Sequence, residues 1–181
     1  MNILIFGVQG AGKSTVGKYI AEKLEIPFIA TGDIFRELKE EASPLGELVK
    51  GKVDEGELVP DETTMEIVNR RLNREDVLGG FVLDGAPRNL AQVKMFKSVV
   101  DLIAFVNLSG EEAVKRLLER GRHDDTREKI DKRIFWYESQ TKPVIEFYRN
   151  KDIEVIEIDN TKSEEDVQQN VNEQFKNYKR N

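Results

Sequence analysis

The stretch GVQGAGKST, residues 7–15, decides the fold class of this chain. It matches the pattern G-x-x-x-x-G-K-[ST], it follows the short apolar run Asn2–Phe6, and a helical pattern comes after it. Glycines let backbone N–H groups turn inward around an anion, and the first turn of the next helix adds unpaired N–H groups and a positive dipole end. A glycine-rich turn without a ligand is the competing interpretation. The complete pattern in its required context favours a phosphate-binding loop.

The residue types of this loop predict a nucleoside triphosphate with magnesium. Lys13 supplies a positive charge to the β- and γ-phosphates, and the Ser14 hydroxyl, with Thr15 beside it, is placed for the magnesium shell. Asp84 follows the apolar run 81–83, and an acidic residue in that position downstream of a phosphate-binding loop often organises magnesium and its waters. We therefore expect Ser14 and Asp84 to hold Mg²⁺, partly through water.

Composition limits the function classes. The 181 residues are 39% apolar and 34% charged, which is typical of one soluble globular domain. The net charge of −6 argues against a nucleic-acid partner. With no cysteine and one histidine, the chain has no disulfides and no thiolate or histidine metal cluster. It has neither a signal-peptide pattern nor an apolar run of about 20 residues, so we expect a cytoplasmic protein without membrane attachment.

The order of the apolar patterns predicts the architecture. Strands are expected at 2–6, 27–30, 81–83, 102–108 and 153–158, separated by helices that include 15–24, 110–120, one after residue 125 that Pro143 breaks, and 164–178. Such alternation predicts an α/β fold with a five-stranded parallel sheet and helices on both faces. We expect a single domain over 1–181 with an inserted flap at 31–60, in which Asp33 caps a helix, and a very short lid at 121–126.

Arginine is abundant at positions predicted to face the crevice at the strand ends. A solvated helix face would explain any single one of them. Phosphoryl transfer, however, needs positive charge around the transferred group and a positioned acceptor, so the set favours a second phosphate-bearing substrate. The arginines are Arg36, Arg88, Arg116, Arg120, Arg122 and Arg133.

Four segments together resemble the adenylate kinase family of nucleoside monophosphate kinases, in its short-lid form. They are the phosphate-binding loop, Thr31-Gly32-Asp33 with Arg36, Asp84-Gly85-x-Pro87-Arg88 with Gln92, and Gly121-Arg122-x-Asp124-Asp125 with Arg133. The resemblance runs nearly end to end. It implies a P-loop fold and reversible transfer of the γ-phosphoryl group of MgATP to AMP, giving two ADP.

The resemblance also implies a role for each matching residue. Catalytic roles fall to Lys13, Arg88, Arg120, Arg122 and Arg133. ATP binding falls to Gly10, Ala11, Gly12, Lys13, Ser14, Thr15, Arg116 and Lys162. The monophosphate pocket comprises Thr31, Arg36, Glu57, Leu58, Val59, Gly85, Ala86, Pro87, Arg88, Gln92, Arg122 and Arg133. A glutamine amide offers a donor and an acceptor, which suits the adenine edge, but the choice of Gln92 as the reader of the base rests on the resemblance.

Two departures from the family pattern affect the expected function. Ala86 stands where the family usually has an aromatic residue, which would loosen the acceptor pocket. Only Gly121 separates Arg120 from Arg122, so a zinc-binding lid is excluded and measurable ATP hydrolysis without acceptor is expected. Two alternatives stay open: a pyrimidine or broad-specificity monophosphate kinase, and an adenylate-kinase-like ATPase that acts as an assembly factor. We expect a monomer with ATP and AMP as its partners.

Overall fold

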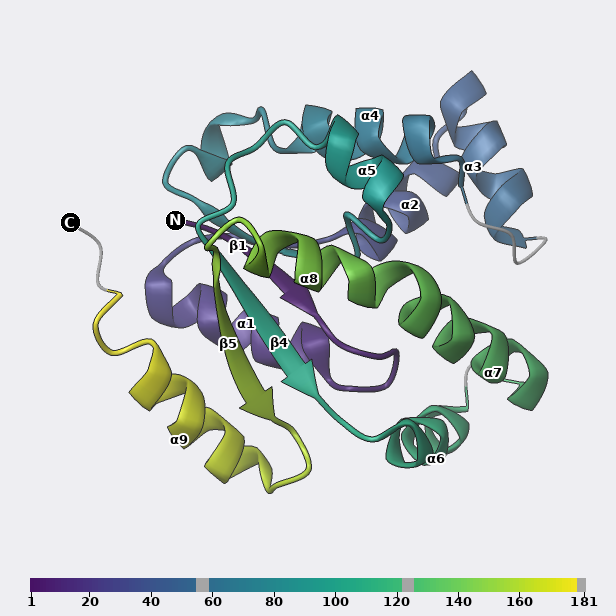
Figure 1. The fold of residues 1–181 in the computed structure, drawn as a ribbon. Coiled ribbons are helices and arrows are strands. Elements are labelled where there is room, and N and C mark those ends of the chain that lie inside the picture. The colour runs from purple at the N-terminus through teal and green to yellow at the C-terminus, as the bar shows by residue number, and fades with distance from the viewer. Residues whose placement is uncertain (55–58, 122–125, 179–181) are drawn as a thin grey trace.

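A five-stranded parallel sheet forms the centre of the computed structural model, which describes residues 1–54, 59–121 and 126–178 (Figure 1). Its strands are β1 (Asn2–Phe6), β2 (Phe28–Ala30), β3 (Phe81–Asp84), β4 (Leu102–Asn107) and β5 (Glu154–Asp159). The spatial order is β2-β3-β1-β4-β5, and every neighbouring pair runs parallel. β1 is central, with β3 and β2 on one side and β4 and β5 on the other, so the carboxyl end of β1 lies at the switch point where open α/β sheets bind ligands.

Helices connect the strands, as parallel pairing requires. They are α1 (Lys13–Leu24), α2 (Thr31–Lys39), α3 (Pro44–Asp54), α4 (Asp61–Arg71), α5 (Leu90–Met95), α6 (Gly110–Arg120), α7 (Arg127–Trp136), α8 (Lys142–Arg149) and α9 (Glu164–Gln174), with a 3₁₀ turn at Glu75–Val77 and a π-helical segment at Tyr137–Thr141. None of the helices in the described ranges is long and apolar enough to cross a bilayer.

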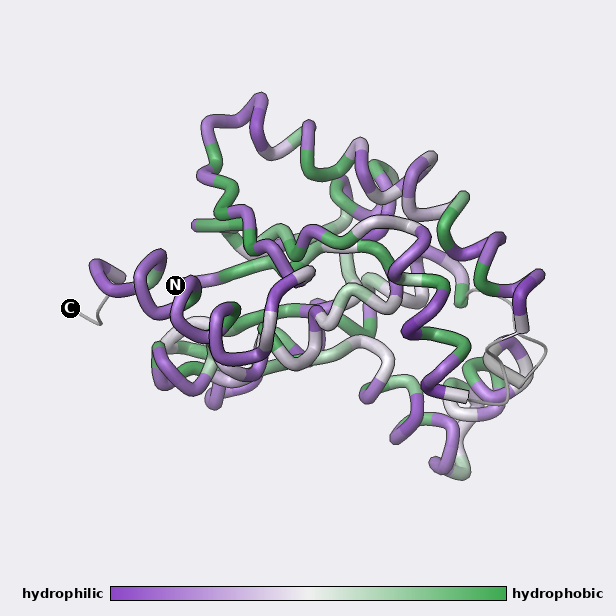
Figure 2. Tube along the Cα trace, turned by 90° about the horizontal axis from the view of Figure 1, so that it is seen from below, coloured by the Kyte–Doolittle hydropathy of each residue, from purple (hydrophilic) through white to green (hydrophobic). Residues whose placement is uncertain are grey.

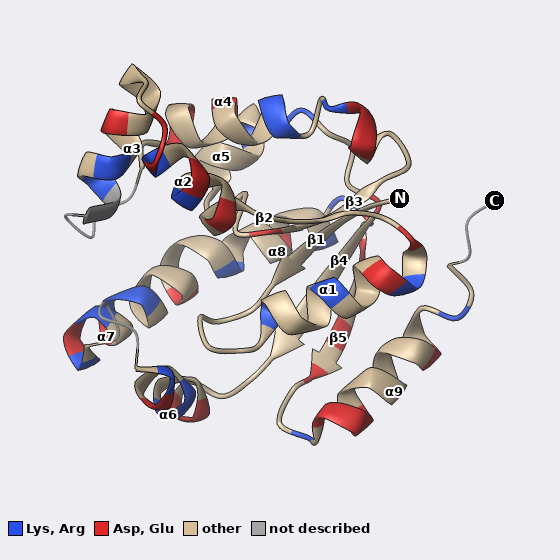
Figure 3. Ribbon diagram, turned by 180° about the vertical axis from the view of Figure 1, so that it is seen from behind, with Lys and Arg blue, Asp and Glu red and all other residues tan. Residues whose placement is uncertain are grey.

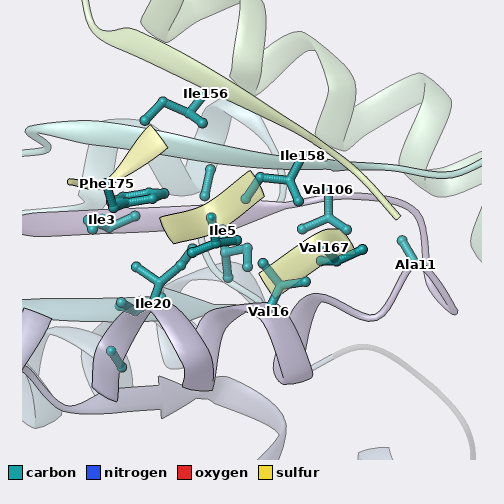
Figure 4. Packing of buried hydrophobic residues seen from close by; sticks show 14 of the residues in the cluster. Ile3, Ile5, Ala11, Val16, Ile20, Val106, Ile156, Ile158, Val167 and Phe175 are labelled. Atoms are coloured by element: carbon teal, nitrogen blue, oxygen red, sulfur yellow. The ribbon is translucent and has the colours of Figure 1, made fainter. Parts of the chain in front are cut away.

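Each face of the sheet has its own hydrophobic core. On one face, α1 and α9 pack against the sheet, and Figure 4 shows Val16 of α1 next to Val167 of α9, with Phe175 next to Ile3 of β1. On the other face, α4 and α8 contribute Met65 and Ile145 to a second cluster. The outer helices alternate between hydrophilic and hydrophobic residues along their length, as expected for helices that bury one side (Figure 2).

The α2–α3 region has a small core that is separate from the two sheet faces. Leu38, Val49, Val59 and Ile67 are buried together there. These residues come from α2, α3, the segment before α4, and α4 itself. This cluster is distinct from the two clusters on the sheet faces, and the interpretation of residues 31–60 as an inserted flap stays a prediction.

The predicted fold class is confirmed, with differences at element boundaries. Asp33 does not cap α2, because the helix begins directly after β2 at Thr31 and Asp33 lies in its first turn. The last helix ends at Gln174 rather than at residue 178. The predicted break near Pro143 is present as the π-helical segment between α7 and α8.

Candidate active site

The loop between β1 and α1 is shaped by glycines in conformations that other residues rarely adopt. Gly10 has φ +90° and Gly12 has φ +82°. A Cβ on Gly10 would lie 2.8 Å from the backbone oxygen of Ala113, and one on Gly12 would lie 2.4 Å from Nδ2 of Asn160. Gly12 is also the N-cap of α1, and no side chain of the described ranges caps this helix. The first N–H groups of α1 are therefore available to an anion.

Ser14, in the first turn of α1, lies beside Asp84, the last residue of β3. The Ser14 hydroxyl donates a hydrogen bond of 2.9 Å to Oδ2 of Asp84, although the two residues are 70 positions apart in the sequence. Asp84 is only 8% exposed. Magnesium is commonly held by one or two protein oxygens together with water and substrate phosphates, so this hydroxyl–carboxylate pair fits the ion. Among the described residues, no group of three or more His, Cys, Asp or Glu side chains could form a protein-only metal site.

Lys13 lies among other charges beside this pair. Its Nζ donates to the backbone oxygen of Val8 at 3.1 Å. Burial is the main cause that lowers the pKa of Lys13, the carboxylate of Asp84 partly opposes this, and the positive charges of Arg88 and Arg120 lower the pKa further. Arg88 and Arg120 therefore lie close enough to Lys13 to influence its charge, and the catalytic role of these cations stays a prediction. A bound polyphosphate would relieve this repulsion.

Arg88 follows β3 and extends the cationic cluster toward α7. Its Nε donates to the backbone oxygen of Gly85 at 2.8 Å, which orients the guanidinium across its own loop. The pKa of Arg88 is lowered, chiefly because the surrounding protein displaces water from the guanidinium, although the residue remains exposed to solvent elsewhere. The carboxylate of Asp84 raises this pKa, and the nearby charge of Arg133 lowers it. Arg133 of α7 therefore acts on the same space as Arg88.

A cavity of about 300 Å³ lies next to the phosphate-binding loop on the side of β5 and α9. Its lining includes predicted ATP-binding residues, namely Gly10, Gly12, Thr15, Arg116 and Lys162, together with Asn160. Asn160 donates from Nδ2 to the backbone oxygen of Ala11 at 2.6 Å, and its own backbone oxygen accepts from Nη2 of Arg116 at 3.0 Å. The side chain of Asn160 thus ties the loop after β5 to the phosphate-binding loop, a role that the sequence pattern did not indicate.

On the opposite side of the loop, Thr31 lies against the segment that follows β3. Thr31 is 1% exposed, and its Oγ1 has no hydrogen-bond partner among the described residues. A Cβ on Gly85, which has φ +97°, would lie 3.3 Å from Cβ of Thr31. Buried hydroxyls are nearly always hydrogen-bonded, so an unpartnered one at this place favours a ligand with polar groups. Thr31 and Gly85 are both predicted pocket residues.

Other predicted pocket residues are engaged with neighbouring protein groups. Arg36 forms an ion pair with Asp33 one turn earlier in α2, and both side chains are largely exposed. Val59 is buried in the small core of the α2–α3 region. Ala86 and Pro87, which precede Arg88 in the same loop, are buried. The looser pocket expected from Ala86 stays a prediction.

Gln92 is buried and both ends of its amide are hydrogen-bonded. Its Oε1 accepts from the backbone N–H of Arg88 at 2.7 Å, and its Nε2 donates to Oδ1 of Asp61 at 2.6 Å. Asn89, the N-cap of α5, also donates to Asp61. Sequence reasoning missed Asp61 and Asn89. An asparagine before a helical pattern is a recognisable cap signal, whereas nothing local marks the contact of Asp61.

Some predicted residues lie outside the described residues. These are Glu57 and Leu58 of the pocket, Arg122 of the catalytic set, and Asp124 and Asp125 of the lid. The flanking helices are described: Arg120 ends α6, and Thr126 caps α7 by accepting from the backbone N–H of Lys129. Acidic and basic residues are interspersed on α6 and α7 (Figure 3).

Comparisons with known proteins agree with this geometry. The model of the adenylate kinase family matches residues 5–153. An adenylate kinase of a Nocardioides species is 44% identical over 170 residues, covering 88% of each chain. One from a Cyanothece species is 39% identical and covers 91% of this chain and 90% of its own. One from Clostridium tetani is 35% identical and covers 94% of this chain and 96% of its own.

Proposed function

The chain belongs to the adenylate kinase family, and on this premise we propose that it transfers the γ-phosphoryl group of MgATP reversibly to AMP. In this reaction the bond from the γ-phosphorus to the β,γ-bridging oxygen breaks and a bond to an oxygen of the AMP phosphate forms, so that two ADP result. The observation that supports the proposal most is the convergence of Asp84, Arg88 and Arg120 on Lys13, whose charge all three influence.

The cations account for the electrostatic part of the reaction. Lys13 would contact the phosphates of ATP, while Arg88, with Arg120 and Arg133, would stabilise the charge on the oxygens of the transferred group. When bound with ATP, magnesium neutralises phosphate charge, and Ser14 and Asp84 are the side chains that would hold it. The role predicted for Arg122 stays a prediction on a residue outside the described ranges.

The two nucleotide sites follow from the two sides of the loop. The cavity lined by Arg116, Asn160 and Lys162 would take the ATP base, and Thr31, Gly85 and Arg88 would border the AMP site. The assignment of Gln92 to the AMP base belongs to the same proposal. A monomeric state and a cytoplasmic location stay predictions from the sequence.

The test is the formation of ADP from MgATP with AMP, CMP, UMP or GMP as acceptor, beside a control without acceptor. Preference for AMP would support the proposal, and preference for a pyrimidine would support the broader kinase that Ala86 allows. ATP hydrolysis that no acceptor stimulates would contradict the proposal and favour the ATPase alternative. Slow hydrolysis beneath a dominant AMP reaction is expected from the short lid, whose residues 122–125 lie outside the described part of the chain.

A further inference from the structure

Asp61, at the start of α4, holds two amide side chains at once. Nδ2 of Asn89 donates to Oδ1 and Oδ2 of this carboxylate at 3.1 and 2.9 Å, and Nε2 of Gln92 donates to Oδ1 at 2.6 Å. Asp61 is partly buried and Gln92 is 4% exposed. Hydrogen bonds to a charged acceptor in such surroundings are among the stronger ones in proteins. Asp61 therefore links the helix after the flap to the helix after the Arg88 loop.

These contacts permit only one orientation of the Gln92 amide. The two ends of an amide have nearly the same shape, so hydrogen bonding alone decides which end points where. The carboxylate of Asp61 only accepts and therefore takes Nε2, while the backbone N–H of Arg88 only donates and therefore takes Oε1. Turning the amide over would place oxygen against carboxylate and NH₂ against N–H. Two unfavourable pairs would replace two hydrogen bonds.

The fixed amide has bonding capacity left for a ligand. Oε1 can accept a second hydrogen bond and Nε2 has a second N–H to donate. A base with an amino group next to a ring-nitrogen acceptor, as in adenine, matches this acceptor–donor order. A base with an oxo group next to a ring N–H, as in hypoxanthine, needs the opposite order, which Gln92 could offer only after its amide turned over.

We propose that Asp61 is the positioning residue that fixes the Gln92 amide and thereby selects an amino over an oxo base in the acceptor nucleotide. The proposal rests on the proposed function, because it assumes that Gln92 reads the base of the acceptor. Asp61 acts through Gln92 and needs no contact with the substrate. Asn89, which donates to both oxygens of the carboxylate, holds it in place.

The test compares AMP with inosine monophosphate, which differs from AMP only at this edge of the base. Values of kcat and KM are measured for both acceptors in the unaltered protein, in Asp61→Ala and in Asp61→Asn. We expect Asp61→Ala to lower the ratio of kcat/KM for AMP over inosine monophosphate by about tenfold or more, the scale of losing one hydrogen bond to a charged group. Most of the change should be a higher KM for AMP, with the KM for ATP within about twofold because the donor site is untouched.

Asp61→Asn keeps the size of the side chain and protects the test against a folding defect. Whichever way the new amide turns, its NH₂ faces the donor of Asn89 or of Gln92, so the ratio should fall in the same direction but less. Glu62→Ala is the matched control, because Glu62 is an exposed acid in the same first turn of α4. It removes the same favourable helix-dipole charge and should leave the ratio unchanged.

The outcomes separate this proposal from the proposed function. If the unaltered protein uses AMP but does not discriminate against inosine monophosphate, or if both Asp61 variants keep the discrimination, the positioning role is overturned and the kinase activity stands. If AMP does not stimulate ADP formation, the proposed function fails. The ratio of AMP to inosine monophosphate affinities, measured by calorimetry in the same variants, then decides the role of Asp61 by the same criterion.

Discussion

On the donor side of the site, where we propose that ATP binds, the polypeptide backbone shapes the site, whereas on the acceptor side, where we propose that AMP binds, the side chains do. The phosphate-binding loop lies within nine consecutive residues, and Gly10 and Gly12 allow it to lie close against Ala113 and Asn160. The acceptor side instead joins side chains from separate helices, such as Asp61 of α4 with Gln92 of α5. The donor side should therefore be sensitive to any added Cβ, and the acceptor side to the loss of individual polar groups.

The largest effect is expected where both sides meet, at Lys13. Lys13→Met keeps the apolar part of the side chain and removes the charge, and we expect the transfer rate to fall by about 10³-fold or more, in the range of losing a principal electrostatic group. The thermal midpoint without nucleotide should not fall, because burial and two arginines already disfavour the charged amine. Initial rates and thermal unfolding check both expectations. Near-normal turnover would remove Lys13 from the mechanism.

Arg88→Ala should cost transfer far more than it costs ATP binding. We expect kcat to fall about 10²–10³-fold, since Arg88 shares its task with neighbouring arginines, while the Kd for ATP changes little. Initial-rate assays measure kcat, and calorimetry measures the Kd for ATP. Arg127→Ala is the control, because Arg127 forms an exposed ion pair with Asp131 and should leave the rate unchanged. An equal loss of ATP affinity would assign Arg88 to the donor side.

Gly12→Ala tests whether backbone conformation shapes the donor side. Alanine would have to adopt φ +82° with its Cβ 2.4 Å from Nδ2 of Asn160. We expect the free energy of unfolding to fall by about 1–3 kcal/mol, together with weaker ATP binding. Urea unfolding and calorimetry measure these changes. Unchanged stability and affinity would show that the loop can rearrange, and the contrast between the two sides would be wrong.

The smallest effect is expected for the same substitution in the flap. Gly51 lies within α3 and an added Cβ there meets nothing within 4 Å among the described residues. Gly51→Ala should raise the free energy of unfolding by about 0.5–1 kcal/mol, because alanine favours a helix more than glycine does. Urea unfolding and the KM for AMP are the measurements. Destabilisation on the scale of Gly12→Ala would show that the flap backbone is as constrained as the loop.

The sequence alone determined the features that depend on residues adjacent in the chain. The loop with Lys13 and Ser14, the approximate strands and the acid at the end of β3 are confirmed, because local patterns of glycine, apolar side chains and charge fix them. The prediction of Asp33 as a helix cap was wrong because α2 follows β2 without a linker, which places Thr31 as its first residue.

Only the tertiary structure decided which distant side chains meet. Asn160 reaches Ala11 across 149 positions and Gln92 reaches Asp61 across 31, and no local pattern marks either pair. The packing of parallel strands brings the loops after β1 and β5 together, where Asn160 meets Ala11, whereas Asp61 meets Gln92 because α4 packs against α5. The sequence thus determined the glycine-rich loop after β1, where we propose that phosphates bind, while the fold decided the hydrogen bonds that hold Gln92 in one orientation.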